Sequence, residues 1–407
     1  MRRAFRHNGF PMLFVGTTTS MFGDSVMLLV FSMWVKELTG SNAKAGLTFF
    51  WMVLPSLVAP LLGGPIDRVR RRPLLVWGNL ASAVMLLPLL FVRDAGQVWV
   101  IWSVAFLYGV SFVVLPAGLN GLLKLLVPED ELVDANASLR TVREGLRLVG
   151  PLVGAAIFGG LGGGAVAVID ALSFTVAALL IARIPVEEPD PREQPMGDYW
   201  AELGTGARHL AGERVLRHVL VAFATMLLVL GFAEASLYAV LDAFGRPVEF
   251  AGVLVAIEGV GAVAGGLAVP RIVRRFSEPG TVAIGLALLG SSFAVVATAS
   301  APAVLLVAVV LLGFSIPVLF VAYTTLVQRR TPQRLMGRVG TALEVILGAP
   351  QAVSLAVGAA LVQVLDYRTI FGLMAGVTLL GGVQLVARLG RSAFTPDTGA
   401  GPAVAEP

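Results

Sequence analysis

The chain has 407 residues, of which 57% are hydrophobic and only 14% are charged. A soluble domain carries about 25% charged residues, so this composition excludes an ordinary water-soluble protein. The net charge of +4 does not indicate a nucleic-acid partner, because the basic residues are ordered by membrane side. There are no cysteines, which excludes a disulfide framework and a thiolate metal site.

Apolar runs of about 20 residues recur along the chain, and each is long enough to cross a hydrocarbon core of about 30 Å. The first run is too long for a signal peptide, so we interpret it as the first span. Prolines interrupt the second and third runs, which helical spans tolerate where neighbours satisfy the freed backbone groups. The twelve expected spans are about 10–35, 45–66, 74–92, 98–122, 137–160, 164–183, 217–241, 250–270, 281–299, 302–327, 337–363 and 369–388.

The positive charges favour one orientation in the lipid bilayer. With the N-terminus in the cytoplasm, 25 of the 30 lysine and arginine residues fall on cytoplasmic segments and 5 fall in outer loops. This distribution satisfies the positive-inside rule. We therefore expect both termini to lie in the cytoplasm.

A polar stretch rich in proline and acidic residues, residues 185–216, divides the spans six and six. It ends in a segment that predicts a short interfacial helix with Trp200, Leu203 and Leu210 toward lipid. The expected organisation is a six-helix bundle over 1–184, a cytoplasmic linker over 185–216, a second six-helix bundle over 217–391 and a disordered tail over 392–407.

The two halves share sequence features at a nearly constant spacing. The basic motif G-x-x-x-(D/P)-R-x-x-R-R at 63–72 begins again 203 residues later, at Gly266. Gly109-Val-Ser is followed 204 residues later by Gly313-Phe-Ser. Because each half has an even number of spans, these matches indicate parallel repeats about an axis along the membrane normal.

The first basic motif resembles the loop between spans two and three of the major facilitator superfamily, G-x-x-x-D-(R/K)-x-G-(R/K)-(R/K). Arg70 stands where the family has its second glycine, and Pro270 replaces the acid in the second copy. The resemblance implies an all-α membrane protein with twelve transmembrane helices in two parallel six-helix bundles. The matching residues of the first copy are Gly63, Asp67, Arg68, Arg71 and Arg72.

Further segments resemble exporters within that family. Gly150-Pro151-Leu-Val-Gly154 in span five is similar to the core of the antiporter motif, with Ala155 in place of the final glycine. This likeness implies export of small, often amphipathic molecules across the bacterial cytoplasmic membrane. Segments similar to the branch of macrolide and enterobactin exporters are Phe22-Gly23-Asp24, Leu126-Val-Pro128, Ala135-Asn136-Ala137, Ile169 to Phe174 and Gly337-Arg338-Val339.

Other sources of chemistry are excluded by the residues present. None of the three lysines follows a glycine, so no phosphate-binding G-x-x-x-x-G-K-(S/T) motif exists for ATP. The three histidines have no metal-ligand spacing. We therefore expect a secondary transporter without cofactor or metal, and neither an enzyme nor an ATP-driven pump.

Acidic residues inside the spans are the remaining candidates for function. Each costs about 2.5–3.5 kcal/mol on insertion scales and marks a functional site by default. We expect the cavity acids that couple transport to protons to be Asp24, Glu234, Glu258 and Glu344. The alternative for each is a packed structural acid. Asp170 on span six is expected to tie that span to a neighbour instead.

The basic motif is expected to act as a conformational latch at the cytoplasmic side. Asp67 can accept hydrogen bonds from a helix N-terminus or from arginine, and such bonds would hold one transport state. In span five, one helical side carries Arg140, Arg143, Glu144 and Arg147, and this spacing lets Glu144 pair with Arg140 and Arg147. This side either belongs to the latch, facing Asp67, or anchors the span at the membrane surface.

The favoured function is proton-coupled efflux of a small amphipathic molecule by alternating access. Proton-coupled uptake, transport of a lipid-like substrate, and a non-transporting sensor or scaffold on the same fold are the alternatives, because a fold alone does not define a function.

The latch generates a first prediction. Asp67→Asn keeps the size of the side chain and removes the charge that pairs with arginine. We expect transport to fall strongly while substrate binding stays near normal, because the residue lies at the cytoplasmic mouth. Flux and binding are measured on the same purified variant, and full transport activity would remove Asp67 from the mechanism.

Overall fold

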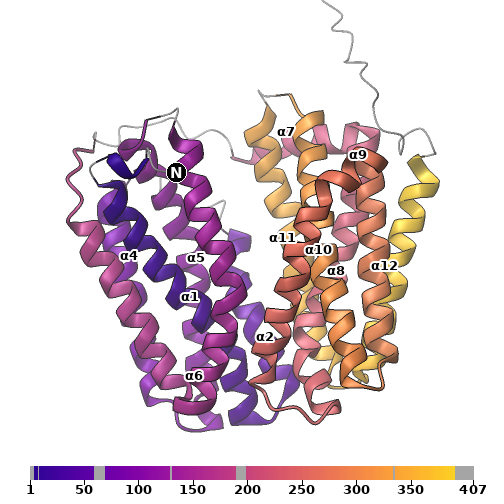
Figure 1. Ribbon diagram of the computed structural model, residues 1–407, viewed down its shortest axis with the longest axis horizontal. Coiled ribbons are helices and arrows are strands. Elements are labelled where there is room, and N and C mark those ends of the chain that lie inside the picture. Colours follow the sequence, from indigo (N-terminus) through magenta and orange to yellow (C-terminus); the bar gives the residue numbers. More distant parts are fainter. Residues whose placement is uncertain are drawn as a thin grey trace, which may run out of the picture. The chain divides into compact units, whose positions relative to one another are not determined.

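The computed structural model describes residues 4–7, 9–58, 69–128, 131–188, 199–332 and 335–389. Over these residues the chain is helical and contains no strand, and nine of its helices are long and apolar enough to cross a membrane (Figure 1). The all-α membrane architecture is therefore confirmed. In chain order the elements are η1 (Ala4–Arg6), α1 (Phe10–Thr39), α2 (Asn42–Val53), η2 (Leu54–Val58), α4 (Arg71–Leu86), η3 (Leu87–Phe91), η4 (Ala95–Gln97), α5 (Val98–Leu126), α6 (Leu132–Ala182), α7 (Tyr199–Gly212), α8 (Arg214–Ala243), α9 (Phe250–Thr298), α10 (Pro302–Arg330), α11 (Met336–Leu361) and α12 (Tyr367–Leu389).

Two of these helices each contain two expected spans. α6 has 51 residues and α9 has 49, so each would be about 75 Å long if straight, more than twice the thickness of a hydrocarbon core. Each is broken at one non-helical residue, Gly162 (φ 78°) in α6 and Ser277 (φ 60°) in α9. Gly162 adopts this positive φ without a steric clash because glycine has no Cβ.

The second expected span is described only in part. α2 and η2 cover residues 42–58, and the rest of the run to residue 66 lies outside the described residues. The count of twelve spans therefore stays a prediction. The third run forms α4 and continues as η3 around Pro88, because proline cannot donate the backbone hydrogen bond that an α-helix needs there.

The chain separates into two compact units. The first contains Met1–Tyr199, Gly231–Ala256 and Leu355–Leu365. The second contains Trp200–Leu230, Ile257–Ser354 and Asp366–Pro407. The first unit thus combines most of the N-terminal half with parts of α8, α9 and α11.

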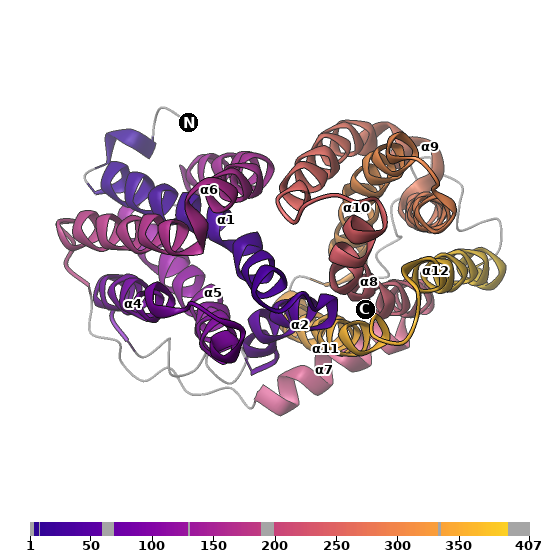
Figure 2. The ribbon, with the colours of Figure 1, turned by 90° about the horizontal axis from the view of Figure 1, so that it is seen from below.

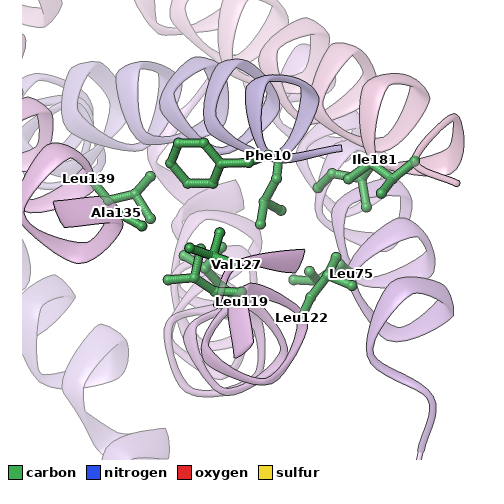
Figure 3. Close-up of a cluster of buried hydrophobic side chains, with 11 residues drawn as sticks. Phe10, Leu75, Leu119, Leu122, Val127, Ala135, Leu139 and Ile181 are labelled. Carbon is green, nitrogen blue, oxygen red and sulfur yellow. The ribbon is translucent and has the colours of Figure 1, made fainter. Parts of the chain in front are cut away.

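Within the first unit, α1 makes its most extensive contacts with α6, and both α5 and α6 pack against α4 (Figure 2). Apolar side chains from all four helices meet near the start of α1 and the end of α5 (Figure 3). Phe10 and Leu122 are fully buried there, and Leu75 and Ile181 are nearly so. Burying one such side chain contributes about 1.5–3 kcal/mol, so this cluster holds the four helix ends together.

The repeated Gly-x-Ser segments make equivalent packing contacts in the two halves. A Cβ at Gly109 of α5 would collide with the backbone carbonyl of Met52 in α2. A Cβ at Gly313 of α10 would collide in the same way with the carbonyl of Glu258 in α9. Both glycines therefore allow two helix backbones to approach closely, which explains why both sequence copies carry glycine.

Within the second unit, α7 packs against the start of α11. A Cβ at Gly206 would collide with the carbonyl of Arg338, which lies in the first turn of α11, and Leu210 is 1% exposed. Just after α7, Glu213 accepts a hydrogen bond from the Arg330 guanidinium at 2.8 Å. The expectation that Leu210 faces lipid is therefore wrong, because this close approach buries the side chain against protein.

Two polar contacts join α1 to α8 inside the first unit. The hydroxyl groups of Ser32 and Tyr238 lie 2.6 Å apart. One helical turn further along each helix, the Lys36 ammonium donates to Asp242 at 2.6 Å. Lys36 also donates to the side-chain oxygen of Asn42 at 2.7 Å and to the carbonyl of Gly40 at 3.1 Å. All three ammonium hydrogens therefore have an acceptor, as a buried lysine requires.

The Lys36 contact generates a stability prediction. Asp242→Ala leaves the ammonium of Lys36, whose side chain is 10% exposed, with two neutral acceptors. Since Asp242 is half exposed, the cost should lie between that of exposed and buried ion pairs, at about 2 kcal/mol in the free energy of unfolding. Thermal unfolding in detergent measures it. Glu37→Ala, an exposed acid on the same helix end, is the control and should change stability by less than about 0.5 kcal/mol.

The orientation in the membrane is tested by cysteine labelling, because the chain has no cysteine of its own. Ala95 and Ala211 are both exposed alanines, one in η4 and one in α7. We expect Ala95→Cys to react with an impermeant thiol reagent added to intact cells, and Ala211→Cys to react only after lysis. Reaction of Ala211→Cys in intact cells would reverse the orientation.

Candidate functional site

One polar cluster in the first unit is centred on the hydroxyl of Tyr108. This oxygen lies 2.6 Å from Oδ1 of Asp24 and 2.8 Å from Oδ2 of Asp170. Tyr108 and Asp170 have no exposed surface, whereas Asp24 is half-buried. The cluster therefore brings together one residue each from α1, α5 and α6, and we call it the Asp–Tyr–Asp triad.

The local sequence of α6 explains how Asp170 reaches the triad. Asp170, Ser173 and Phe174 are three and four residues apart, so they share one face of the helix. The Ser173 hydroxyl donates to the backbone carbonyl of Asp170 at 2.8 Å and lies 3.3 Å from its Oδ1. This face of α6 is directed toward α1.

Three aromatic rings fix the ring of Tyr108. Phe31 of α1, Phe112 of α5 and Phe174 of α6 each meet it edge-on, with centroids 5.2, 5.1 and 6.1 Å away. Such edge-to-face pairs stabilise a defined orientation. The hydroxyl is consequently held between the two carboxyl groups by packing as well as by hydrogen bonds.

Glycines on both sides of the contact permit this arrangement. A Cβ at Gly23 would collide with Asp170 and Ser173 on the second part of α6. On the first part of α6, a Cβ at Gly150 would collide with Ser25, and one at Gly154 with the carbonyl of Val26. α1 therefore fits closely between the two parts of α6, at the residues that flank Asp24.

The antiporter-like motif thus lies beside the acid on span one. Ser25, the neighbour of Asp24, donates to the carbonyl of Leu146 at 2.5 Å, one turn before Gly150. Pro151 stands inside α6, where it cannot donate a helical hydrogen bond. The functional role predicted for Gly150, Pro151 and Gly154 is not tested by this packing.

The expected basic side of span five lies near the triad. Arg143 is exposed, and its charge acts on Asp24. The neighbouring Arg140, Glu144 and Arg147 are also exposed. In the part of the chain that the structure describes, Glu144 forms no ion pair with these arginines, so the pairing expected from their spacing is not made in this conformation.

The other acids predicted to line a cavity are distributed over both units. Glu234 lies half-buried in the first unit, and Glu258 lies half-buried in the second. Glu344 lies in α11, and its side chain is outside the described residues. A joint role of these acids with Asp24 stays a prediction. Within the described residues, no group of three His, Asp or Glu side chains is placed to hold a metal ion.

Of the expected latch motif at residues 63–72, only the last residues lie within the part of the chain that the structure describes. Gly63, Asp67 and Arg68 lie outside the described residues, and the latch therefore stays a prediction.

Arg71 and Arg72 open α4, and their backbone N–H groups both donate to the carboxylate of Glu188, the second at 2.7 Å. The Arg72 guanidinium donates to the carbonyls of Ile181 and Ala182 at the end of α6. A carboxylate thus lies at a helix N-terminus and a cation at a helix C-terminus, which the helix dipoles favour.

Three residues of these sites were missed by the sequence reasoning. Tyr108 carried a usable signal, because a tyrosine inside an apolar span needs a partner for its hydroxyl. Gly23 stood only in a segment that carries the family resemblance, and the packing roles of Gly23 and Glu188 could not be predicted, since they depend on which helix lies opposite them.

The helical fold, with helices long and apolar enough to cross a bilayer, defines a multi-pass membrane protein. A model of the Major Facilitator Superfamily matches residues 13–353, and the chain belongs to this family.

Two relatives and one solved structure are similar to this chain. The chain is 26% identical over 352 residues to the multidrug efflux pump Tap of Mycobacterium tuberculosis (strain ATCC 25618 / H37Rv), covering 83% of each chain. It is 23% identical over 190 residues to the macrolide efflux protein A of Streptococcus pyogenes, covering 46% of this chain and 47% of the relative. The crystal structure of the nucleoside transporter NupG superposes with a TM-score of 0.74 at 13% identity, covering 94% of this chain and 99% of that one. The last likeness concerns the fold alone.

Proposed function

We propose that this protein is a proton-coupled exporter of a small amphipathic molecule and works by alternating access in a bacterial cytoplasmic membrane. The observation that carries the proposal is the carboxyl group of Asp24. It lies half-buried inside α1, and no described residue forms an ion pair with it. An acid in this setting is costly to insert and is retained where it binds protons or cationic groups.

The relatives support export rather than uptake. Tap and the macrolide efflux protein A are named as efflux proteins, and the antiporter-like motif around Gly150 packs directly against the helix that carries Asp24. A proton that enters down its gradient can exchange at Asp24 with a substrate that leaves. A half-buried carboxylate among apolar side chains suits an amphipathic substrate, above all one with a positive charge.

The proposal includes the latch and the orientation. The basic motif that ends at Arg72 controls access at the cytoplasmic side, and both termini lie in the cytoplasm. Protons and a small molecule are the partners, and no cofactor, metal, enzymatic step or nucleic acid takes part.

Two other functions remain as experimental alternatives. Proton-coupled uptake uses the same acids in the opposite direction, and transport of a lipid-like substrate would use them for a different cargo. A sensor or scaffold on this fold would not require a titrating acid inside α1, and Asp24 therefore argues against it.

Asp24→Asn tests the coupling. The amide keeps the shape of the side chain and cannot release a proton, so we expect substrate movement driven by a pH gradient to fall at least about tenfold while downhill exchange is retained. Flux into proteoliposomes is measured with and without an imposed pH gradient, using compounds found by a resistance screen in an efflux-deficient host. Glu258→Gln should have a similar or weaker effect.

Asp94→Asn is the matched control, because Asp94 is an exposed acid that caps η4 and asparagine caps equally well. If Asp24→Asn and Glu258→Gln both keep the wild-type response to the gradient, coupling through these acids is wrong. A wild type that moves no compound in either direction favours the sensor.

A further inference from the structure

We infer that Asp24, Tyr108 and Asp170 form one proton-binding site in which a single proton is shared by the two carboxyl groups, and that its occupancy sets how closely α1 packs on α6. This inference deepens the proposed function and rests on it for its role in transport. The site itself rests on the geometry alone.

The Tyr108 hydroxyl has fewer hydrogens than its two contacts need. The Tyr108 hydroxyl has one hydrogen to donate, yet its oxygen lies within hydrogen-bond distance of two carboxyl oxygens, at 2.6 and 2.8 Å. If Asp24 and Asp170 were both ionised, one of these contacts would join two oxygens with no hydrogen between them. A proton on either carboxyl group completes the chain, because that group then donates to the tyrosine oxygen.

Within the described residues, the two carboxyl groups of the triad are not neutralised by a neighbouring cation. Neither aspartate forms an ion pair with a basic residue in the part of the chain that the structure describes. The groups that act on the pair are Tyr108 from α5, Ser173 from α6 and the more distant, exposed Arg143 from the first part of α6. Two negative charges bridged by one hydroxyl would repel each other in surroundings of low polarity. One shared proton removes that repulsion.

The two carboxyl groups lie at a close contact between α1 and α6. Gly23 brings α1 so close to α6 that a Cβ would collide with the Asp170 carboxylate and the Ser173 hydroxyl. When the shared proton is lost, Asp24 and Asp170 are both negatively charged and repel each other at the point where α1 and α6 are closest. The expected response is that α1 moves away from the second part of α6.

The same helix, α1, connects the triad to α8. Ser32 and Lys36, which bond to α8, stand two and three turns beyond Asp24 on the same helix, about 12 and 18 Å away along its axis. A shift of α1 at the triad therefore reaches the contacts that join α1 to α8. Proton occupancy and the packing of the first unit are coupled through one rigid helix.

Asp24 is the entry point of this site. It is half-buried, whereas Tyr108 and Asp170 have no exposed surface. Protons and substrates therefore reach Asp24 first. Asp170, which is hydrogen-bonded to Tyr108, is the second carboxyl group that binds the same proton. A purely structural Asp170, which only ties α6 to its neighbours, would bind no proton jointly with Asp24.

Infrared spectroscopy of the purified, substrate-free protein tests the site directly. As the pH is raised, the wild type should lose one protonated-carboxyl C=O band, equivalent to about one proton per molecule. Asp24→Asn and Asp170→Asn should each remove that same band, because either amide can donate to the tyrosine oxygen in place of the shared proton. Tyr108→Phe should shift the band. A band that survives unchanged in Asp170→Asn overturns the inference.

Thermal unfolding supplies a second measurement. The folded triad binds a proton, so the stability of the wild type should fall as the pH is raised through the loss of the band, and Asp170→Asn should not show this fall. If Asp170→Asn does not fold, Asp24→Asn at the half-buried partner carries the same prediction. Thr175→Ala is the control, because the Thr175 hydroxyl on α6 donates to the carbonyl of Ala171 and to no residue of the triad, so this variant should retain the pH dependence.

Gly23→Ala tests the link to packing. The added methyl group forces α1 and α6 apart at the triad, and we expect the band to be lost at a pH at least about one unit lower than in the wild type, because the separated carboxyl groups no longer share the proton. Gly145→Ala is the matched control on α6, where a Cβ would meet nothing within 4 Å. If the band of Gly23→Ala is lost at the same pH as that of the wild type, the binding of the shared proton does not depend on the α1–α6 contact. This result overturns the inferred link between proton occupancy and helix packing.

The transport assay separates the two proposals. If the infrared band behaves as expected but no compound responds to a pH gradient, the proton site stands and the proposed function fails. If Asp24→Asn uncouples transport while Asp170→Asn and Tyr108→Phe keep full coupling, the function stands and the sharing of the proton is wrong.

Discussion

The close packing of α1 between the two parts of α6 is the constraint on which the first unit depends. Gly23 faces one part of α6, while Gly150 and Gly154 face the backbone of α1 from the other. In a bilayer the lipid tails are as apolar as the side chains, so helices associate through close van der Waals packing and hydrogen bonds. Small residues at these contacts bring Asp24 within reach of both α5 and α6.

Polar groups placed at such a contact have to satisfy one another, because no bulk water is available. The Asp–Tyr–Asp triad does so with two short hydrogen bonds, and three phenylalanines hold the tyrosine ring in place. A fully satisfied network specifies one geometry, and a network that lacks one proton is costly. The same arrangement that stabilises the helices is therefore sensitive to protonation.

The internal duplication appears in the packing as well as in the sequence. Gly109 and Gly313 each let one helix approach the carbonyl of another. The repeats are nevertheless not equivalent in chemistry, since the triad belongs to the first unit. At the C-terminal end of α1, Lys36 is enclosed by three acceptors, one of which comes from α8. A helix from each half thus contributes to one compact unit.

The sequence by itself determined the membrane class, the helical architecture, the family and the acid on span one. The membrane class and the helical architecture follow from run length and composition, and the family follows from motifs that resemble those of known members; all of these are local properties of the chain. It also indicated that Asp170 ties span six to a neighbour. Only the tertiary structure decided which neighbour this is, because Asp24, Tyr108 and Asp170 are 62 to 146 residues apart and no local pattern records which helices touch. For the same reason the burial of Leu210 was predicted wrongly, and the roles of Gly23 and Glu188 became visible only when the opposing helix was in place.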